Sequence, residues 1–402
     1  MLASIVHFML RIRLVVVVVA LALCGAGVYA LKHLSVDAFP DVTNIQVQVA
    51  TVAIGRSPEE MERLVTVPVE IAMTGLPGLV EMRSMNKSGL SLITLVFTDK
   101  TDVFFARQLV MERIIDVTPR LIPGITPVLG PVSTGLGEVY QYTIEHPDDG
   151  KRALTEEELM ERRTIQDWVV RPMLRSIRGV AEINSIGGYV KEYQVYVDPN
   201  KLRHFDLTLT EVDRALANNN ANASGNILAL RYEQYLIRGV GLIASLEDIR
   251  NIVLREMNGV PVYVRDVADV TFGGEVRQRA SIKNGAAEAV TGIVMVLRGG
   301  NAKEIVGRIK EKVTEINERG LLPDGRRIVP FYERTIMVDA ALDSVSRVLI
   351  EAMVFVIIVM VICLGNFRIS LVVCATLIIT PLVTFMIMNY FGIPANLMSL
   401  GG

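Results

Sequence analysis

The order of hydrophobic and polar positions divides this chain into three apolar runs and one long mixed region. The runs are residues 14–31, residues 348–364 with Glu351 as their one charge, and residues 369–391. Because a bilayer core takes about 20 apolar helical residues, the pattern predicts three membrane-spanning helices. The second includes a polar leading segment and is expected over 336–364.

Two other interpretations of these runs stay open. The last two runs could form a buried hairpin in a large soluble core, but so long a stretch with almost no charge would need cover on all sides. The first run could instead be a signal peptide, since Val28-Tyr29-Ala30 resembles a cleavage site. Signal cores usually have about 7–15 residues, so the longer run 14–31 favours an uncleaved first span.

The distribution of arginines predicts the orientation. Arg11 and Arg13 precede the first span, which places residues 1–13 in the cytoplasm. The mixed region then lies outside, in the periplasm of a Gram-negative cell, and Arg368 returns to the cytoplasm in agreement with this assignment. Residues 395–402 follow a turn and are apolar, so we expect the start of a fourth span and the front part of a longer membrane protein.

The mixed region alternates strands and capped helices, and its pattern occurs twice. The first copy has strands at 45–51 and 90–97 and two helices. Ser57 begins a capping box for the first helix, in which Pro68 should cause a kink, and the second starts near Thr101. The order β-α-β-β-α-β predicts a ferredoxin-like unit.

The second copy is interrupted. Its parts are a strand at 139–145, a helix after the Thr155 capping box, a strand at 180–186, and later a strand, a helix and a strand within 289–332. The expected fold is therefore an α/β membrane protein with three spans, the start of a fourth, and two ferredoxin-like βαββαβ units. The expected soluble parts are a first porter subdomain (32–134), a second porter subdomain in two pieces (135–188 and 275–335) and a docking insert (189–274).

Composition adds limits to this picture. The 402 residues would usually form two or three domains. With 51% hydrophobic and 21% charged residues, spans combined with a sizeable soluble part fit best. A net charge of −2 without a basic run gives no reason to expect a nucleic-acid partner. The three cysteines all lie in apolar runs, so the mixed region has no disulfide framework.

Catalytic and cofactor motifs are absent from the sequence. None of the four histidines has a partner three or four residues away, and no nucleophile elbow, P-loop or dinucleotide fingerprint occurs. We therefore expect no enzyme and no cofactor. Glycine-rich Ser133–Gly137 is expected to be a flexible interdomain turn, because a strand rather than a helix follows it. Met82 and Met85 are expected to pack in the core or on the surface.

Five strings resemble the heavy-metal efflux branch of the resistance–nodulation–division transporters, and the cobalt–zinc–cadmium exporters most. The resemblance covers essentially the whole chain, and the strings lie at residues 37–41, 130–138, 165–172, 332–335 and 396–401. It implies an inner-membrane proton antiporter that acts as a homotrimer with a periplasmic adaptor, or membrane fusion protein, and an outer-membrane channel. Metal cations are the implied substrate and lipid the surroundings.

The resemblance covers only the first third or so of such a transporter. The family's acidic proton-relay residues lie on the fourth span, and the three expected spans hold no mid-membrane Asp, Glu, Lys or His. Met398 matches a methionine near the pathway through the membrane and is the one candidate metal residue. Where the copper/silver branch has a methionine in a Glu-Met-Arg string, this chain has Val276, which favours divalent ions.

The sequence thus predicts the N-terminal part of a proton-driven exporter of divalent metals such as cobalt, zinc and cadmium. A Cu(I)/Ag(I) exporter of the same branch is one alternative. A multidrug exporter is a second, although aromatic residues make up only 6% of the chain. A third is a truncated module that acts in periplasmic assembly and does not transport.

Overall fold

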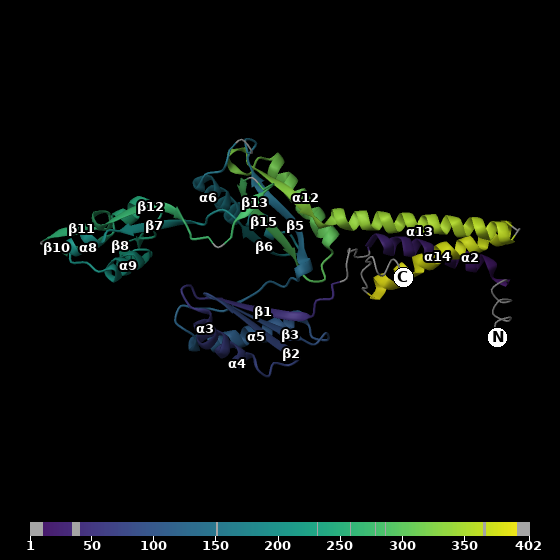
Figure 1. Ribbon diagram of the computed structural model, residues 1–402, viewed down its shortest axis with the longest axis horizontal. Coiled ribbons are helices and arrows are strands. Elements are labelled where there is room, and N and C mark those ends of the chain that lie inside the picture. The colour runs from purple at the N-terminus through teal and green to yellow at the C-terminus, as the bar shows by residue number, and fades with distance from the viewer. Residues whose placement is uncertain are drawn as a thin grey trace. The chain divides into compact units, whose positions relative to one another are not determined.

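The computed structural model describes residues 11–33, 41–149, 152–230, 232–257, 259–277, 279–285, 287–364 and 367–391 (Figure 1). The chain forms two compact units, and each is described by itself. The first comprises Met1–Pro147, Val170–Asn184 and Gly292–Gly402, and the second comprises Asp148–Val169 and Ser185–Thr291. The subdomain boundaries expected from the sequence stay predictions.

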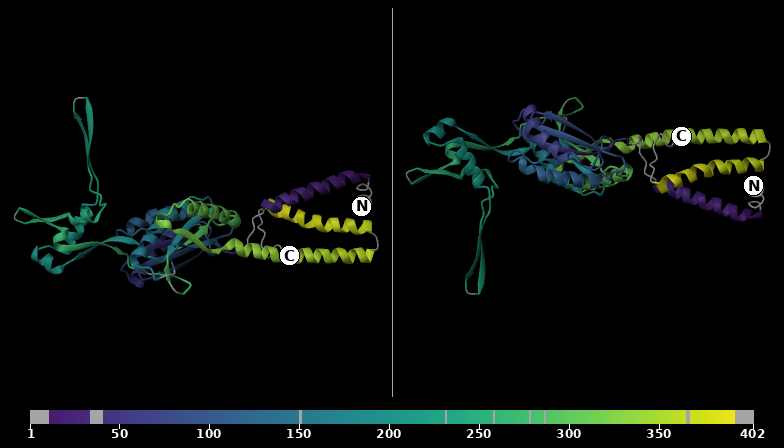
Figure 2. Two further views of the ribbon diagram at one scale, coloured as in Figure 1. Left: turned by 90° about the horizontal axis from the view of Figure 1, so that it is seen from above. Right: turned by 90° about the horizontal axis from the view of Figure 1, so that it is seen from below.

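Three long helices of the first unit lie side by side (Figures 1 and 2). They are α2 (Arg13–His33), α13 (Arg334–Leu364) and α14 (Phe367–Phe391), and α14 contacts both of the others. A Cβ atom on Gly27 would lie 2.6 Å from the Cβ of Leu382. Glycine at this position therefore allows the backbones of α2 and α14 to approach closely, as small residues do between membrane helices.

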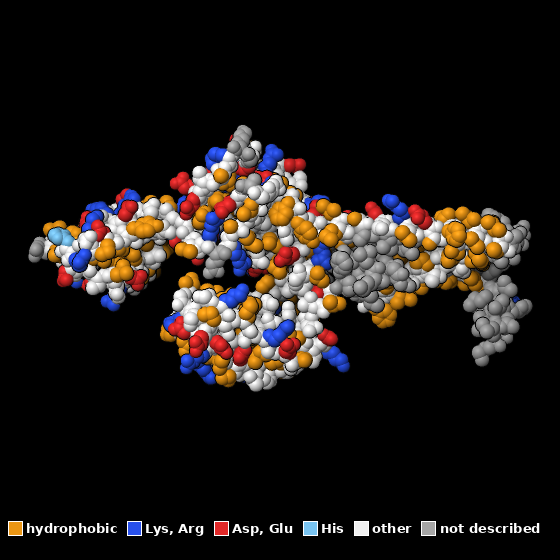
Figure 3. All heavy atoms as spheres, viewed as in Figure 1, with side chains coloured by type: hydrophobic (Ala, Val, Ile, Leu, Met, Phe, Trp, Pro, Cys, Tyr) orange, Lys and Arg blue, Asp and Glu red, His pale blue; other side chains and the backbone are white. Residues whose placement is uncertain are grey.

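The three helices differ in their apolar length. Within the described residues, one stretch, Leu14–Leu31 of α2, is long and apolar enough to cross a membrane, while Ile350–Cys363 and Ala375–Phe391 are shorter apolar stretches. Hydrophobic side chains nevertheless gather on the outside of α13 (Figure 3), among them Phe355 and Ile362 at 67% and 74% exposure. An apolar surface of this extent is unfavourable in water.

The first sheet consists of β1 (Ile45–Val52), β2 (Leu79–Lys87), β3 (Leu90–Phe97) and β4 (Val128–Leu129), in the order β2-β3-β1-β4. Helices α4 (Val67–Met73) and α5 (Val103–Val117) pack against each other, and α5 packs on β1. One face of α5 is buried, at Ala106, Val110, Ile114 and Val117. These side chains share one core with Val47, Val49, Ile93 and Leu95 of the sheet.

The second sheet consists of β5 (Glu138–Glu145), β6 (Val180–Ile186), β15 (Thr291–Val296) and β16 (Arg327–Glu333), in the order β16-β5-β15-β6. Helix α12 (Ala302–Glu318) packs on β5 and β16, and its buried stripe includes Ile305, Ile309, Val313 and Ile316. When the strands of each sheet are numbered 1 to 4 in chain order, both sheets have the order 2-3-1-4, the second being read from β6 to β16. The short helix α7 (Arg171–Arg175) precedes β6.

The helix starts agree with the sequence, but the expected kink takes another form. Ser57 accepts a hydrogen bond from the backbone of Glu60, and Glu60 accepts one from the backbone of Ser57, at the start of α3 (Pro58–Met61). Instead of a simple kink at Pro68, a π-helical turn, η1 (Glu62–Thr66), precedes α4. Proline has no N–H and its ring crowds the carbonyl four residues back, so the wider turn relieves both problems.

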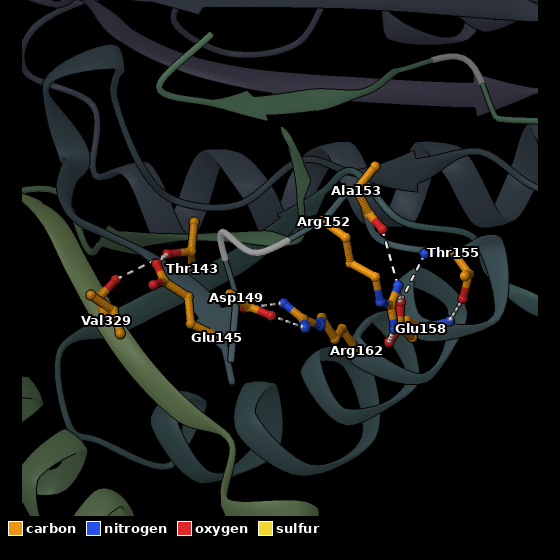
Figure 4. A network of polar contacts seen from close by, with 9 residues as sticks. All are labelled: Thr143, Glu145, Asp149, Arg152, Ala153, Thr155, Glu158, Arg162 and Val329. Carbon is orange, nitrogen blue, oxygen red and sulfur yellow. Dashed lines mark hydrogen bonds and ion pairs between the residues drawn. The ribbon is translucent and has the colours of Figure 1, made fainter. Parts of the chain in front are cut away.

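The second unit begins with helix α6 (Glu156–Ile165), whose start is fixed by polar contacts (Figure 4). Arg152 donates to both carboxylate oxygens of Glu158 at 2.6 and 2.8 Å, and Thr155 closes the predicted capping box. Hydrogen bonds from Arg152 lower the pKa of Glu158 to about 2. Buried Arg162 pairs with Asp149 at 2.6 Å. A second π-helical turn, η4 (Gln166–Val170), follows α6.

The rest of the second unit is mostly the insert. A two-stranded ribbon of β7 (Lys191–Val197) and β12 (Ala268–Gly274) leads into it. Its core is built from α8 (Pro199–His204), α9 (Leu209–Asn218), α10 (Leu246–Arg250), β10 (Val253–Met257), β11 (Val260–Tyr263) and α11 (Val264–Val267). The hairpin of β8 (Ala223–Leu230) and β9 (Glu233–Gly239) projects from this core (Figure 2), and its described side chains are exposed.

The first strand predicted within 289–332 is divided in the structure. Residues 287–296 form β14 (Ala287–Ala289), which pairs with β13 (Ser281–Lys283), and then β15 of the second sheet. Three short 3-10 turns complete the description: η2 (Thr118–Arg120), η3 (Gly135–Gly137) and η5 (Pro323–Gly325).

Candidate functional site

Three of the strings singled out in the sequence meet in the first unit, where the chain passes between the long helices and the two sheets. Thr134 donates to Asp41 at 3.0 Å, which links residues 37–41 to residues 130–138. Arg334, at the start of α13, donates to the backbone carbonyl of Leu136 and is 6% exposed. We call this cluster of Asp41, Thr134, Leu136, Arg298 and Arg334 the joint.

Residues 41–44 are held by a charged network. Arg298 donates to the backbone carbonyls of Thr43 and Asn44, the latter at 2.7 Å. Burial of Asp41 favours its neutral form, but hydrogen bonds from Thr43 and Thr134 and the charge of Arg298 outweigh it. The pKa of Asp41 therefore lies below its usual value. The carboxylate is ionised at neutral pH, which strengthens each of these hydrogen bonds.

The residues next to the glycine-rich turn at 133–137 make several hydrogen bonds, and the expected flexibility of the turn stays a prediction. The carbonyl of Gly130 accepts from Arg107 at 2.5 Å, and its N–H donates to Gln48 at 2.8 Å. Further along, the N–H of Arg298 donates to the carbonyl of Val132. Gly137 is closely packed, since a Cβ there would lie 3.2 Å from the carbonyl of Val296, whereas Gly135 has open space around it.

The other side of the joint is the start of α13. Strand β16 ends at Glu333 and α13 begins at Arg334, so no loop separates sheet from helix. Lys310 of α12 pairs with Glu333 at 2.8 Å, and Lys303 pairs with Asp339 at 2.6 Å. A displacement of α13 must therefore move the edge strand of the second sheet.

Glu333 also affects a buried tyrosine on the neighbouring strand. Tyr140 lies opposite Glu333 in the β5–β16 ladder and is 1% exposed. Burial, together with the negative charge of Glu333, raises the pKa of Tyr140 to about 12. The phenol thus stays neutral, and the charge beside it is balanced by Lys310.

Metal-ligating side chains do not cluster in the part of the chain that the structure describes. Within the described residues there is no group of three or more His, Cys, Asp or Glu side chains that could hold an ion. Met398, the one metal residue predicted from the sequence, lies outside the described residues. Met82 packs partly buried against the first core and Met85 is exposed, in line with packing roles.

One methionine missed by the sequence reasoning has polar neighbours. The Sδ atom of Met295 in β15 lies 3.1 Å from Nδ2 of Asn184 in β6 and 3.9 Å from Oγ of Ser133. Buried Val294 and Val296 flank Met295, so strand alternation places Met295 on the opposite face of the sheet. The alternating positions along this strand were the sequence signal that could have revealed Met295. A thioether beside an amide and a hydroxyl can contact a soft cation.

Val276, where the copper/silver branch has a methionine, lies within the described residues. Val276 is 91% exposed. The neighbouring Arg277 donates to both oxygens of Glu288 at 2.6 and 2.8 Å and lies over the ring of Tyr189 at 4.3 Å. No soft ligand stands at this position.

Comparison with known proteins identifies the family. The model of the AcrB/AcrD/AcrF family matches residues 5–402. The chain belongs to this family. Across its full length it is 43% identical to the cobalt-zinc-cadmium resistance protein CzcA of Cupriavidus metallidurans and 36% identical over 391 residues to the cation efflux system protein CusA of Escherichia coli K12. It therefore lies in the heavy-metal efflux branch of the resistance–nodulation–division transporters.

A solved structure agrees with this assignment. The chain matches a heavy metal efflux pump in crystal form II with a TM-score of 0.88 and 33% identity, over 99% of this chain and 39% of that one. The chain spans 38% of the length of the CzcA protein it resembles. The fold is that of this transporter family, with a large mixed α/β region.

Proposed function

We propose that this chain is the N-terminal part of an inner-membrane permease that exports divalent cations of the cobalt, zinc and cadmium type in exchange for protons. In this proposal α2, α13 and α14 are three membrane spans, and the two sheets with their helices are ferredoxin-like porter subdomains in the periplasm. The insert is the docking subdomain. Names of relatives support the substrate class, since CzcA is a cobalt-zinc-cadmium resistance protein.

The direct continuation of β16 into α13 is the observation that carries the mechanism. Proton binding elsewhere in the membrane part would shift α13, and the joint would transmit this shift to the second sheet. Arg334 holds the start of α13 to Leu136 of the turn, while Arg298 holds Asn44 through its side chain and Val132 through its N–H. The cation-facing wall would then include Met295, on the face of the sheet opposite the buried valines.

The partners form part of the proposal. A homotrimer is supported by the outer face of α5, where Phe104 and Ile115 are 62% and 61% exposed, and by the projecting β8–β9 hairpin. Such apolar surface favours contact with another protein. We propose that the trimer assembles with a periplasmic adaptor and an outer-membrane channel, and that the permease acts as a transporter without enzyme activity.

A Cu(I)/Ag(I) exporter is the second candidate. Met295 and the similarity to CusA favour it, whereas the exposed Val276 in place of a soft ligand disfavours it. Thioethers bind Cu(I) better than they bind harder divalent ions. The two candidates therefore differ in which salts the permease protects against.

The test uses the complete transporter that contains this sequence, expressed with its adaptor and channel in a bacterium lacking metal exporters. Growth and cell-associated metal are measured with zinc, cobalt, cadmium, copper and silver salts, with and without a protonophore. We expect protonophore-sensitive resistance to the three divalent metals. Resistance to copper and silver alone would establish the second candidate, and unchanged metal content in every case would overturn the export proposal.

A further inference from the structure

A recess in the second unit has no role in the proposed export path. It lies beside the base of the β7–β12 ribbon and has a volume of about 380 Å³. Its walls come from the end of α6 with η4, from the ribbon, and from the loop at Ala244. Pockets for small ligands typically have about 300–1,000 Å³, so one small molecule fits, whereas a protein partner needs a much larger contact area.

Three aromatic side chains line the recess. Tyr193 and Phe272 face each other across the ribbon, with ring centroids 5.2 Å apart. Trp168 in η4 is 79% exposed, and Tyr193 and Phe272 are both 42% exposed. A tryptophan this exposed leaves a large apolar face in contact with water, and aromatic faces of this kind favour stacking with another planar ring.

The charged side chains of the recess indicate whether it favours a positively or a negatively charged ligand. Arg163 and Asp167 pair at 2.6 Å, and Ser185 donates to Asp167 at 2.5 Å. Lys191 has its ammonium 4.0 Å from the centroid of Phe272 and has no carboxylate partner among the described residues. Glu192 also lines the recess, but its carboxylate accepts a hydrogen bond from Gln194 at 2.9 Å, on the ribbon face opposite Lys191 and Tyr193, because strand side chains alternate. The unpaired charge on the aromatic face is therefore positive.

We propose that this recess binds a small planar aromatic anion, such as an aryl carboxylate. The ring would stack on Trp168 and against the Tyr193–Phe272 pair, and the carboxylate would meet Lys191. Each of these residues is supplied by the second unit alone, and none is part of the joint or of the Met295 cluster. Binding would bridge the end of α6 and the base of the insert.

The fluorescence of Trp168 reports binding at this site, because Trp168 is the single tryptophan of the sequence. The purified full chain in detergent is titrated with 4-nitrobenzoate, whose nitroarene ring quenches tryptophan fluorescence on stacking, and with the neutral analogue 4-nitrobenzamide. We expect saturable quenching by the anion and binding of the amide weakened about fivefold, the size of one exposed ion pair.

Three variants make the test specific. Lys191→Met should abolish the preference for the anion while leaving the weaker binding of the amide, and Lys191→Arg should retain it. Phe272→Leu should weaken both probes. Lys201→Met, on exposed α8 of the same insert, is the matched control and should bind as the parent does. Circular dichroism confirms that each variant is folded.

Three results would overturn the proposal. One is quenching that rises linearly with both probes, since this indicates collisions with an exposed tryptophan. Another is saturable quenching with the same preference in Lys191→Met. The third is a tryptophan shielded from both probes in the assembled protein, which would show that a second copy or another partner covers the recess.

Discussion

The two four-stranded sheets share one strand order but differ at one connection. In the first, β2 and β3 are joined by a tight turn at Ser88 and Gly89. In the second, the corresponding strands β6 and β15 are separated by the whole insert. The insert is tolerated because β7 and β12 pair in register from Val197 to Lys191, so the chain leaves and returns at neighbouring positions. A hairpin connection is thus a place where a domain can be added.

The two connections also differ in how closely their glycines are packed. At the exit, Gly187 and Gly188 have φ values of +80° and +67°, which residues other than glycine rarely adopt. The surroundings are crowded: Arg163 donates to the carbonyl of Gly187 at 3.0 Å, and a Cβ on Gly187 would lie 2.2 Å from the carbonyl of Ala289. In the first unit, a Cβ on Gly89 would meet its nearest atom at 3.2 Å.

The largest expected effect comes from substituting these two turn glycines. Gly187→Ala should cost about 3 kcal/mol of unfolding free energy, because it adds steric overlap to an unfavourable φ. Gly89→Ala is the matched variant in the first unit and should cost about 1–2 kcal/mol, from its φ value alone. Denaturant unfolding of the purified full chain measures both. Equal losses would contradict the different crowding of the two turns.

The next effect concerns the joint. Arg334→Ala removes the hydrogen bond to Leu136 and should weaken local stability by about 2 kcal/mol. If α13 drives the second sheet, export in the complete transporter should fall about tenfold, which corresponds to a typical coupling free energy. Metal content of cells reports export, and hydrogen exchange of β16 reports the local change.

Arg319→Ala is the control for this variant, because its pair with Glu315 on α12 is exposed. It should leave both readouts unchanged. Normal export by the Arg334→Ala protein at normal membrane levels would show that the transport cycle does not depend on the joint.

A smaller effect is expected at Met295, which has no matching methionine on the first sheet's β3. Met295→Leu conserves volume and should cost less than about 1.5 kcal/mol of stability. Loss of the thioether should reduce protection against silver and copper severalfold more than protection against zinc. Growth across a series of metal concentrations measures the ratio, with Met85→Leu on the exposed β2 as control. An unchanged ratio would remove Met295 from the cation path.

The smallest effect is at the start of α6. The pKa of Glu158 lies at about 2, below its usual value, so its stabilising contribution is complete above the ordinary carboxyl range and disappears as pH falls toward 2. Glu158→Gln should cost about 1 kcal/mol at neutral pH, as loss of a cap contact does. The difference from the parent should shrink between about pH 4.5 and 2. A difference that grows on acidification would contradict the assigned contacts.

The sequence predicted the parts of the fold that have a buried face. Helix α12 is an example, because Ile305, Ile309, Val313 and Ile316 recur at helical spacing and are all buried. The β8–β9 hairpin shows the opposite case. Its first strand was missed because Ala, Ser, Gly and Asn carry no alternating pattern, and both strands are exposed. The π-helical turns were missed because Pro68 and Pro172 indicate that the helix is interrupted but do not indicate whether the interruption is a kink or a π-helical turn.

The candidate site could be predicted only in part. The strings around Asp41, Thr134 and Arg334 were visible in the sequence, yet their contact depends on a tertiary arrangement that no local pattern encodes. Lys303 and Asp339 were missed because their pairing joins α12 to α13 across separate elements. Met398 and the turn before it lie outside the described residues, so the predicted metal role of Met398 stays a prediction.

The central claim is that α2, α13 and α14 lie in the membrane while the two four-stranded sheets, their helices and the insert lie outside it. The most direct measurement replaces the three native cysteines by serine and introduces single cysteines at Asn200, on exposed α8, or at Phe355, on the apolar surface of α13. Cells with a permeabilised outer membrane but an intact inner membrane are treated with a membrane-impermeant maleimide. The account predicts labelling of Asn200→Cys and none of Phe355→Cys until detergent is added. Labelling of Phe355→Cys in these cells, or protection of Asn200→Cys, would contradict it.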